Sequence, residues 1–519
     1  MSLVISLLMA VSVFAADDIE GLLAGSGNTD KASHSLLSDI IQSQGGNVAA
    51  SEVQVFLRAF EANNWDEALM KFRPAFGGKS FESNPNGIAL KSYLYMKAGL
   101  QVTGLENLFQ ISQPKKIHYH ILSLIRESAP QSASAWSVAQ VRWNTDWSEI
   151  FGSATEARSK AFQETAQKST QELIEISKKS AANSNEKAMA DWALVLQYSK
   201  QDKVKDAAAL IATMLKSEQK LISKDLLNMT AARLLYQNGY FEAAIKYYQK
   251  IEKKSEYWFD AQEELAWSHV RKGDPQNAIA ITTTLAHPAF VGQVGPEPFF
   301  IRSLAQLKVC DYPSVVNELQ MFPQRFKNRY QELKLISETP AQPHVEQALV
   351  QIEEGKSPVV SGKSLPRAIV NDELLRKRLQ VKHQLDVEAN AAQRLYAKSL
   401  ESTGLQATFG EIKEKLSRRS ESAKQTSLNR IKELATDEVW ETKAILEKMH
   451  IIEAEVISQV AIAGKLAKSD LGQEKTKLGT TGSQSEDTLR FPGDQEVWFD
   501  ELSNFKVDIK KGCQKKGTL

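Results

Sequence analysis

The sequence predicts an all-α protein, and three observations carry this prediction. Proline (15) and glycine (26) are scarce among the 519 residues, and no long run of valine and isoleucine alternates as a strand does. Two segments in the middle of the chain can be superimposed with a shift of 34 residues. A third long segment, residues 372–467, repeats apolar residues at helical spacing. We therefore expect stacked helices with little or no sheet.

The two superimposable segments run from Ala231 to Ile251 and from Leu265 to Leu285. Small, glycine and bulky positions correspond between them, in the order Ala232, Gly239, Ala244, Tyr248 and Ala266, Gly273, Ala278, Thr282. This pattern resembles the tetratricopeptide repeat, a helix–turn–helix unit of that period. The resemblance implies a small residue where the two helices cross, a glycine in the turn, and protein–protein binding through a concave surface.

The first residues have the pattern of a secretory signal. An apolar run from Leu3 to Phe14 is followed by small residues, and Val13 and Ala15 suit the −3 and −1 positions of a cleavage site. We expect a signal peptide over 1–15 and a mature chain that starts at Ala16. No lysine or arginine precedes the run, so a displaced start or an ordinary apolar helix are the alternatives. Residues 16–47, rich in Gly, Ser, Asp and Asn, are expected to form a flexible segment.

Weaker copies of the repeat extend over residues 48–352, where we expect a continuous solenoid of at least five helix pairs. One copy has its turn at Asn63 and its second helix around Phe72, and others have their turns near Gly99, Asp202 and Cys310. Residues 353–371 contain Gly, Ser and two prolines, and are expected to form a linker or a cap.

Residues 372–467 predict a helical hairpin with a break at 402–404. The longer helix carries a heptad seam with two polar interruptions. The seam positions are Leu428, Ile431, Ala435, Glu438, Thr442, Ile445, Met449, Ile452, Val456, Gln459 and Ala463. We expect the seam to pair within the chain, with residues 372–400 or with the solenoid. An intermolecular coiled coil is the alternative.

Residues 468–488 lack large aromatic residues and are expected to form a flexible linker, followed by a docking tail over 489–519. In the tail Trp498, Leu502 and Phe505 would share one helical face, with Phe491 nearby. We expect this face to pack on the chain's own solenoid, and insertion into a partner's groove is the alternative. The tail is similar to an FPxxGExWxDELxxY-type motif at the C-terminus of exported repeat proteins of gliding and predatory bacteria. The glycine is displaced here, and Phe505 replaces the tyrosine.

Charge and chemistry favour a binding protein over an enzyme. The 64 basic and 63 acidic residues leave a formal net charge of +1, which gives no reason to expect nucleic acid as a partner. No nucleotide-binding, nucleophile-elbow or zinc-protease motif occurs, and His118 and His120 are spaced poorly for chelation on a helix. We predict no catalytic residue, metal or cofactor. The two cysteines, Cys310 and Cys513, could form one disulfide in an exported protein or remain free thiols.

The sequence therefore predicts a non-catalytic, exported scaffold that binds other proteins of a bacterial envelope complex in the solenoid groove, with no membrane span after signal cleavage. Asn228 and Gln262 on the first helices, with Lys246 nearby, are the groove candidates, because amides can bond a peptide backbone of any sequence. A binder of cell-wall glycan, or a modulator of wall enzymes, is the first alternative, which the scattered tryptophans would permit. A hydrolase with a site assembled from distant helices is the second.

Overall fold

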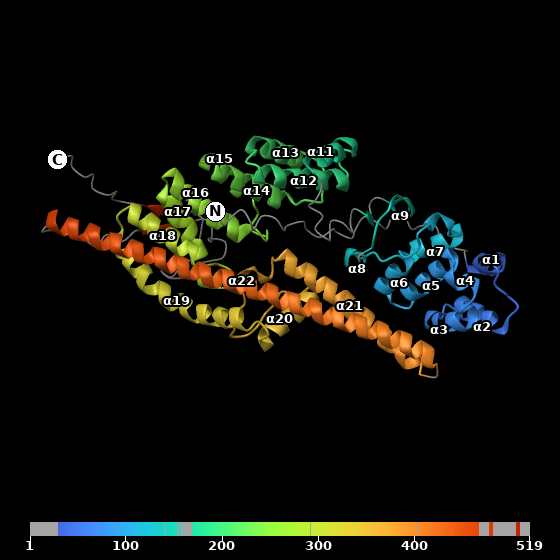
Figure 1. Ribbon diagram of the computed structural model, residues 1–519. Helices are drawn as coiled ribbons and strands as arrows, with labels where there is room; N and C mark the ends of the chain where they lie inside the picture. Colours follow the sequence, from blue (N-terminus) through green and yellow to red (C-terminus); the bar gives the residue numbers. More distant parts are fainter. Residues whose placement is uncertain are drawn as a thin grey trace, which may run out of the picture. The chain divides into compact units, whose positions relative to one another are not determined.

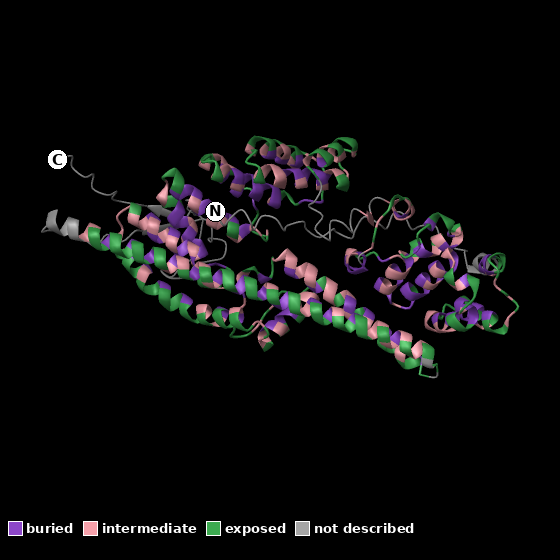
Figure 2. Cartoon of the chain, viewed as in Figure 1, coloured by how far each residue is buried: buried purple, intermediate pink, exposed green. Residues whose placement is uncertain are grey.

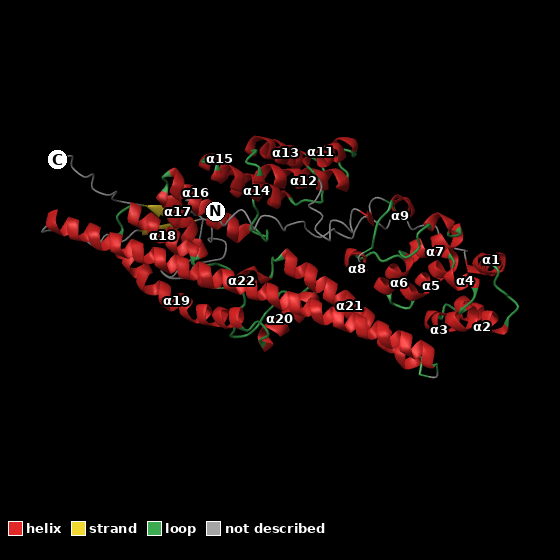
Figure 3. Cartoon of the chain, viewed as in Figure 1, coloured by secondary structure: helices red, strands yellow, loops and turns green. Residues whose placement is uncertain are grey.

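Helices make up nearly all of the structure. The computed structural model describes residues 30–139, 141–152, 155–156, 169–290, 292–400, 402–466, 477–480 and 505–508. Within these residues the only strands are β1 (Lys477–Thr480) and β2 (Phe505–Asp508), which pair antiparallel with Thr480 opposite Phe505 (Figures 1 and 3). The expected all-α class is therefore confirmed. No helix in the described part of the chain is long and apolar enough to cross a bilayer.

The chain forms two compact units, and each is assembled from separated stretches of sequence. Among the described residues, the N-terminal unit combines 30–169 with 373–427, and the C-terminal unit combines 170–372 with those from 428 to 508. This division differs from the predicted boundaries, in which 48–352 was one solenoid and 372–467 a separate hairpin. The division depends on apolar contacts between residues that are far apart in the sequence. Local repeat patterns do not predict such contacts.

The helices of the N-terminal unit enclose one continuous apolar core. They are α1 (Asp30–Ser43), α2 (Ser51–Glu61), α3 (Trp65–Phe76), α4 (Ser80–Ser83), α5 (Pro85–Lys97), α6 (Gln101–Leu108), η3 (Pro114–Lys116), α7 (Tyr119–Ser128), α8 (Ala133–Ala139), α9 (Thr145–Phe151), α21 (Glu373–Lys398) and the first part of α22 (Thr403–Leu466). Within 16–47, where the sequence predicts a mobile or loosely docked segment, α1 is docked, because Leu37, Ile40 and Ile41 are buried in this core.

Local sequence explains the first helix pair of this unit. The Asn64 side chain accepts a hydrogen bond from the Glu67 amide and caps α3. Behind the cap, the predicted second-helix residues Ala68, Phe72 and Ala75 are fully buried. The small residues let the helices approach closely, and the phenylalanine fills the space between them.

Helices from a later part of the sequence complete this core. Leu385, Ala392 and Leu395 of α21, and Phe409 of α22, are buried in the same cluster as the early helices. Polar contacts fix the same surface: Glu388 of α21 accepts the Val102 amide at the start of α6 at 2.7 Å. The segment 373–427 is thus an integral part of the N-terminal unit.

The C-terminal unit is a succession of helices in which each contacts the next from α11 to α19. They are α11 (Thr170–Lys179), α12 (Asn185–Lys200), α13 (Val204–Lys216), α14 (Lys224–Gln237), α15 (Phe241–Tyr248), α16 (Trp258–Lys272), α17 (Pro275–Leu285), η4 (Pro288–Phe290), α18 (Glu297–Lys308), α19 (Tyr312–Glu338), α20 (Pro343–Glu353), η5 (Arg367–Ile369) and the rest of α22. Its apolar residues form several small clusters between neighbouring helices.

The superimposable segments occupy equivalent places in α14–α15 and α16–α17. The four alanines expected at the helix crossings, Ala232, Ala244, Ala266 and Ala278, are all fully buried. The turn between the helices of each pair contains a residue with positive φ, which glycine adopts most readily. These residues are Asn63, Gly99, Asp202, Gly239, Gly273 and Cys310. Recurrence of one turn conformation at every predicted turn indicates a common helix-pair geometry in both units.

The long helix α22 contributes to both units and places the predicted seam inside the chain. Nine seam residues from Leu428 to Val456 are buried, including the polar Glu438 and Thr442, and Figure 2 shows buried residues recurring along the helix. Ile445 and Met449 pack against phenylalanines of α18 and α19, and Ile452 and Val456 pack against Val315. The part of the seam from Ile445 to Val456 is therefore covered by helices of its own chain, α18 and α19.

Residues 372–400 are the other predicted partner of the seam within the chain. They pack along a different part of α22. Helix α21 runs antiparallel to residues 403–427, as three contacts show. Arg378 Nη1 donates to the Thr426 carbonyl at 2.7 Å, Ser420 donates to Asp386, and the Lys413 ammonium lies over the Tyr396 ring. The hairpin break near 402–404 is where the sequence predicts it, but the seam begins after the hairpin ends.

Candidate functional site

A strap of non-repeat chain, residues 363–372, is fixed against three helices of the C-terminal unit. The sequence predicts a linker or cap here. Only Pro366 and Ile369 of the strap are buried, and Val370 is exposed, so its apolar anchorage is small. Its other contacts are polar, and most of them use the strap's main chain.

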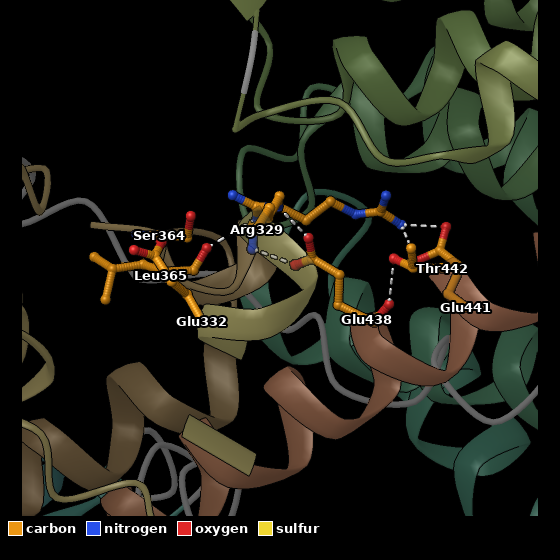
Figure 4. A network of polar contacts seen from close by, with 8 residues as sticks. Arg329, Glu332, Ser364, Leu365, Glu438, Glu441 and Thr442 are labelled. Carbon is orange, nitrogen blue, oxygen red and sulfur yellow. Dashed lines mark hydrogen bonds and ion pairs between the residues drawn. The ribbon is translucent and has the colours of Figure 1, made fainter. Parts of the chain in front are cut away.

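Helix α19 binds the start of the strap through Arg329 and Glu332 (Figure 4). The Glu332 carboxylate accepts the Ser364 amide at 2.8 Å, and Arg329 Nη2 donates to the Leu365 carbonyl at 2.9 Å. Burial raises the pKa of Glu332. The hydrogen bonds from Ser364 lower it by more, so the net pKa lies below its ordinary value. The carboxylate is therefore fixed in its charged form.

Helix α22 binds the middle of the strap through two carboxylates one helical turn apart. Glu438 Oε1 accepts Arg329 Nε at 2.5 Å, and its Oε2 accepts the Arg367 amide at 2.9 Å. Glu441 accepts Nη2 of Arg367 with both oxygens, at 3.0 and 2.8 Å. Thr442 donates to the main-chain carbonyl of Glu438 at 2.8 Å, as drawn in Figure 4. The first polar interruption of the seam is thus a strap contact.

The Arg367 guanidinium occupies a space that a glycine leaves open. A Cβ added to Gly295 would lie 1.2 Å from Nη1 of Arg367, so any side chain at that position would displace the guanidinium. Nη1 itself is buried and has no hydrogen-bond partner among the described residues. Burial lowers the pKa of Arg367, but nearby carboxylates, Glu441 first among them, raise it above its ordinary value. The arginine is therefore charged.

Two carboxylates of α16, Asp260 and Glu263, face this guanidinium without pairing. Among the described residues neither forms a hydrogen bond or an ion pair, yet both act electrostatically on Arg367. Burial raises the pKa of Glu263 well above its ordinary value, Arg367 opposes this, and neighbouring acids, Glu297 and Glu441, raise it further. A raised pKa favours the neutral form of the Glu263 carboxyl beside the charged guanidinium.

The end of the strap is held by amide and carboxylate contacts. Asn371 Nδ2 donates to the Glu256 carbonyl at 3.2 Å, just before α16. Asp372 forms a bidentate pair with Arg430 of α22, with nitrogen–oxygen distances of 2.7 and 3.1 Å. Both ends of the strap are thus fixed on either side of Arg367.

The site can bind an extended segment that carries an arginine. It offers carboxylates to main-chain amides, an arginine to a main-chain carbonyl, and a glycine-lined acidic space to a guanidinium. In the described part of the chain no group of three or more His, Cys, Asp or Glu side chains could hold a metal ion. The chemistry on display is recognition by charge and hydrogen bonding.

The predicted groove residues do not converge on the strap. Asn228 lies on α14 and is buried, with Oδ1 lacking a hydrogen-bond partner. Gln262 lies on α16 and is partly buried, and Lys246 lies on α15 and is exposed. No hydrogen bond or ion pair among the described residues joins these three. Their role in partner binding stays a prediction.

The predicted tail contacts are partly outside the structure's description. Phe491, Trp498 and Leu502 lie outside the described residues. Phe505 is the first residue of strand β2, so the expectation that it continues a helical face is wrong, because its backbone pairs with β1 instead. Strand β2 lies next to α17 of the same unit. Strand β1 in turn falls within 468–488, which was expected to be a flexible linker.

Cys310 is disulfide-bonded, whereas Cys513, the other cysteine of the possible bridge, lies outside the described residues. A bond between these two residues, one of the two alternatives that the sequence leaves open, stays a hypothesis. A thiol titration of the denatured, unreduced chain tests it, and we expect no reactive thiol.

Sequence reasoning missed the strap, although three signals were visible. Glu438 interrupts an apolar seam, which indicates a buried partner for a charge. Glu263 and Glu264 follow Asp260 at spacings of three and four residues, which places both one turn from it on the helix. Gly295 lies in a short Gly/Pro insertion between repeats. What joins these signals is Arg367, which the sequence places more than 70 residues from each of them.

Comparison with known proteins adds no relative. No family model matches the chain, and no curated protein matches it. The resemblance to tetratricopeptide repeats therefore depends on the residues alone.

Proposed function

We propose that this chain is a non-catalytic, tetratricopeptide-like scaffold, which is exported and binds other proteins of a bacterial envelope complex. The observation that supports this most is the recurrence of helix pairs with a positive-φ turn, each packed on the next. Stacked pairs of this kind expose a long series of first helices, and proteins use such surfaces to bind peptide segments. A rigid stack holds this surface in shape, so the partner bears most of the ordering entropy.

The proposed partner surface centres on α14 and α16, the first helices of the two clearest repeats. The side chain of Arg233 on α14 forms a bidentate pair with Glu264 on α16, at 2.6 to 3.0 Å, and Tyr248 donates to the same carboxylate at 2.7 Å. This triad joins α14, α15 and α16 and fixes their relative orientation. Gln262 lies on the same helix as Glu264 and is within reach of solvent.

Crosslinking at defined positions tests the scaffold role. A photo-crosslinking amino acid is introduced in place of Gln262 or Lys246 in the native cell, with Tyr119, an exposed residue of the other unit, as the matched control position. We expect discrete adducts from Gln262, and fewer or different adducts from Tyr119. If neither Gln262 nor Lys246 yields an adduct, and a pull-down from crosslinked envelopes recovers no other protein, the proposal is wrong.

Export is tested separately. Mass spectrometry of the mature protein should give an N-terminus at Ala16, and the protein should be digested by protease added to cells whose outer membrane is opened. An uncleaved protein found only in the cytoplasm would contradict export while leaving the binding role untouched.

The glycan-binding alternative requires exposed tryptophans. Trp136, Trp143 and Trp147 lie with Phe109 and Phe151 in an aromatic cluster of the N-terminal unit, whereas Trp440 is 66% exposed. Trp136 and Trp147 are buried, so they are core residues and do not form an exposed platform for sugars. Co-sedimentation with purified peptidoglycan would revive this alternative.

A further inference from the structure

We propose that the surface around Gly295, Glu438 and Glu441 is a receptor for an arginine-bearing extended peptide of a partner protein, and that the strap occupies it as an internal competitor. This inference depends on the proposed scaffold function, because it names the chemistry of the segment that a partner inserts. It also predicts that the free chain is in a closed state.

The receptor contacts that do not involve the Arg367 side chain are made to the main chain. Glu332 and Glu438 accept the amides of Ser364 and Arg367, and Arg329 donates to the Leu365 carbonyl. Another peptide with this backbone conformation offers the same groups. Another segment could therefore satisfy Glu332, Glu438 and Arg329 as well as the strap does.

Selectivity comes from the guanidinium space. Glu441 binds one edge of the guanidinium with two hydrogen bonds, which a lysine ammonium cannot reproduce in the same geometry. Gly295 leaves room for the guanidinium, because a Cβ at this position would lie 1.2 Å from Nη1. The site therefore selects arginine over lysine.

The strap is held in a way that allows exchange. Its buried apolar anchors are Pro366 and Ile369, whereas the remaining contacts are ion pairs and hydrogen bonds. Paired charges taken from water contribute little net stability, so replacing one arginine peptide by another of the same chemistry costs little. The side chain of Arg367 is also 26% exposed, so the site does not fully enclose it.

Because the strap is part of the same chain, it raises the concentration of partner peptide that is needed for binding. A segment attached to its own site acts at an effective concentration on the order of millimolar. A free peptide of equal affinity therefore binds weakly while the strap is in place. Removing the strap should raise the affinity for the peptide at least about tenfold.

The test uses the full chain and a probe copied from the strap. In one variant residues 363–371 are replaced by a Gly/Ser segment of equal length. The probe is a fluorescent peptide of residues 362–372, and binding is followed by anisotropy. We expect the variant to bind the probe at least about tenfold more tightly than the wild type does. A control probe with alanine in place of Arg367 should lose at least about tenfold in affinity for the variant.

Two results overturn the inference. One is a variant that retains wild-type helicity and melting but binds neither probe. The other is equal binding of the probe to variant and wild type, which places the peptide elsewhere. Since this assay contains no partner protein, its failure leaves the scaffold function standing, and failure of the crosslinking test leaves the peptide assay unaffected.

A single substitution keeps the inference testable if the replaced strap prevents folding. In Arg367→Ala the amide hydrogens of 364–371 should exchange much faster than in the wild type. Addition of the probe should leave this exchange fast, and should slow the exchange of the amides of Glu438 and Glu441 on α22. Arg367→Lys should restore only part of the protection. Unchanged exchange in Arg367→Ala would show that the guanidinium does not hold the strap, and would overturn the proposal.

Discussion

The two units use similar helix pairs but bury their residues in different ways. In the N-terminal unit the early helices and α21 enclose one apolar cluster that extends from Leu37 to Ala423. In the C-terminal unit the apolar residues form small clusters between neighbours, and ion pairs join α19, α22 and the strap. The comparison indicates that closure by a distant helix gives a globular core, whereas stacking alone leaves neighbour-to-neighbour interfaces that polar contacts must supplement.

The largest expected effect is in the apolar core. Phe72 is 1% exposed, and its ring lies 6.0 Å from that of Phe56 and 5.1 Å from that of Phe76. Phe72→Ala should lower the free energy of unfolding of the N-terminal unit by about 3–5 kcal/mol. Hydrogen exchange in urea should show the loss in α2–α6 and not in α14–α17. Ile279→Ala in the other unit is the matched control, and an equal loss in both units from Phe72→Ala would show that they unfold as one.

The buried ion pair of the strap site should come next. Arg329 and Glu438 are 14% and 6% exposed, so removing either leaves an uncompensated charge. We expect Arg329→Leu or Glu438→Leu to destabilise the C-terminal unit by about 3 kcal/mol each. The double substitution should cost much less than the sum, as measured by denaturant unfolding. Lys356→Ala, which removes an exposed ion pair with Glu354, serves as the control and should change stability little. Strict additivity would contradict the pairing.

A pH-dependent effect should follow in the N-terminal unit. Glu388 is fully buried, its Oε2 has no hydrogen-bond partner, and burial raises its pKa to about 7. Because the folded chain binds this proton more tightly than the unfolded chain, its contribution to stability is complete below the ordinary pKa of 4.5 and declines as the pH rises through 7.

Glu388→Gln should remove this dependence. Between pH 5 and pH 8 the wild type should lose up to about 3 kcal/mol of unfolding free energy that the variant keeps. Urea unfolding of both proteins at the two pH values measures the difference. Parallel pH profiles would show that the Glu388 carboxyl does not titrate in this range.

The smallest effect concerns the helix-pair turns. Gly273 has a φ of 88°, and a Cβ added there meets nothing within 4 Å, so the cost of Gly273→Ala is one of backbone conformation. We expect a loss of about 1–2 kcal/mol. Asp202, with a φ of 56°, offers the reverse change, and Asp202→Gly should cost nothing or stabilise slightly. Thermal melting of both variants decides whether the two turns are equivalent.

The sequence was sufficient for features that depend on neighbouring residues. Period and small-residue spacing predicted that Ala232, Ala244, Ala266 and Ala278 would be buried, and heptad spacing predicted the buried seam of α22. It did not predict which helices would cover the seam, because α18 and α19 present the same apolar character as other helices. The sequence also could not predict the contact between Gly295 and Arg367, because a glycine does not indicate which side chain fills the space beside it. The candidate site depends on pairs of charged residues that are far apart in the sequence. The only sign of such a pair in the sequence is a single polar residue within an apolar pattern.

The interrupted order of the N-terminal unit has a consequence for its biosynthesis. Helices α1–α9 leave the ribosome some 200 residues before α21, which carries Leu385 and Leu395 into their core. At 5–20 residues per second this interval is roughly 10–40 s. During that time the nascent chain exposes the apolar surface that Leu385 and Leu395 later cover. A chaperone should therefore remain bound to the nascent chain until α21 has been translated.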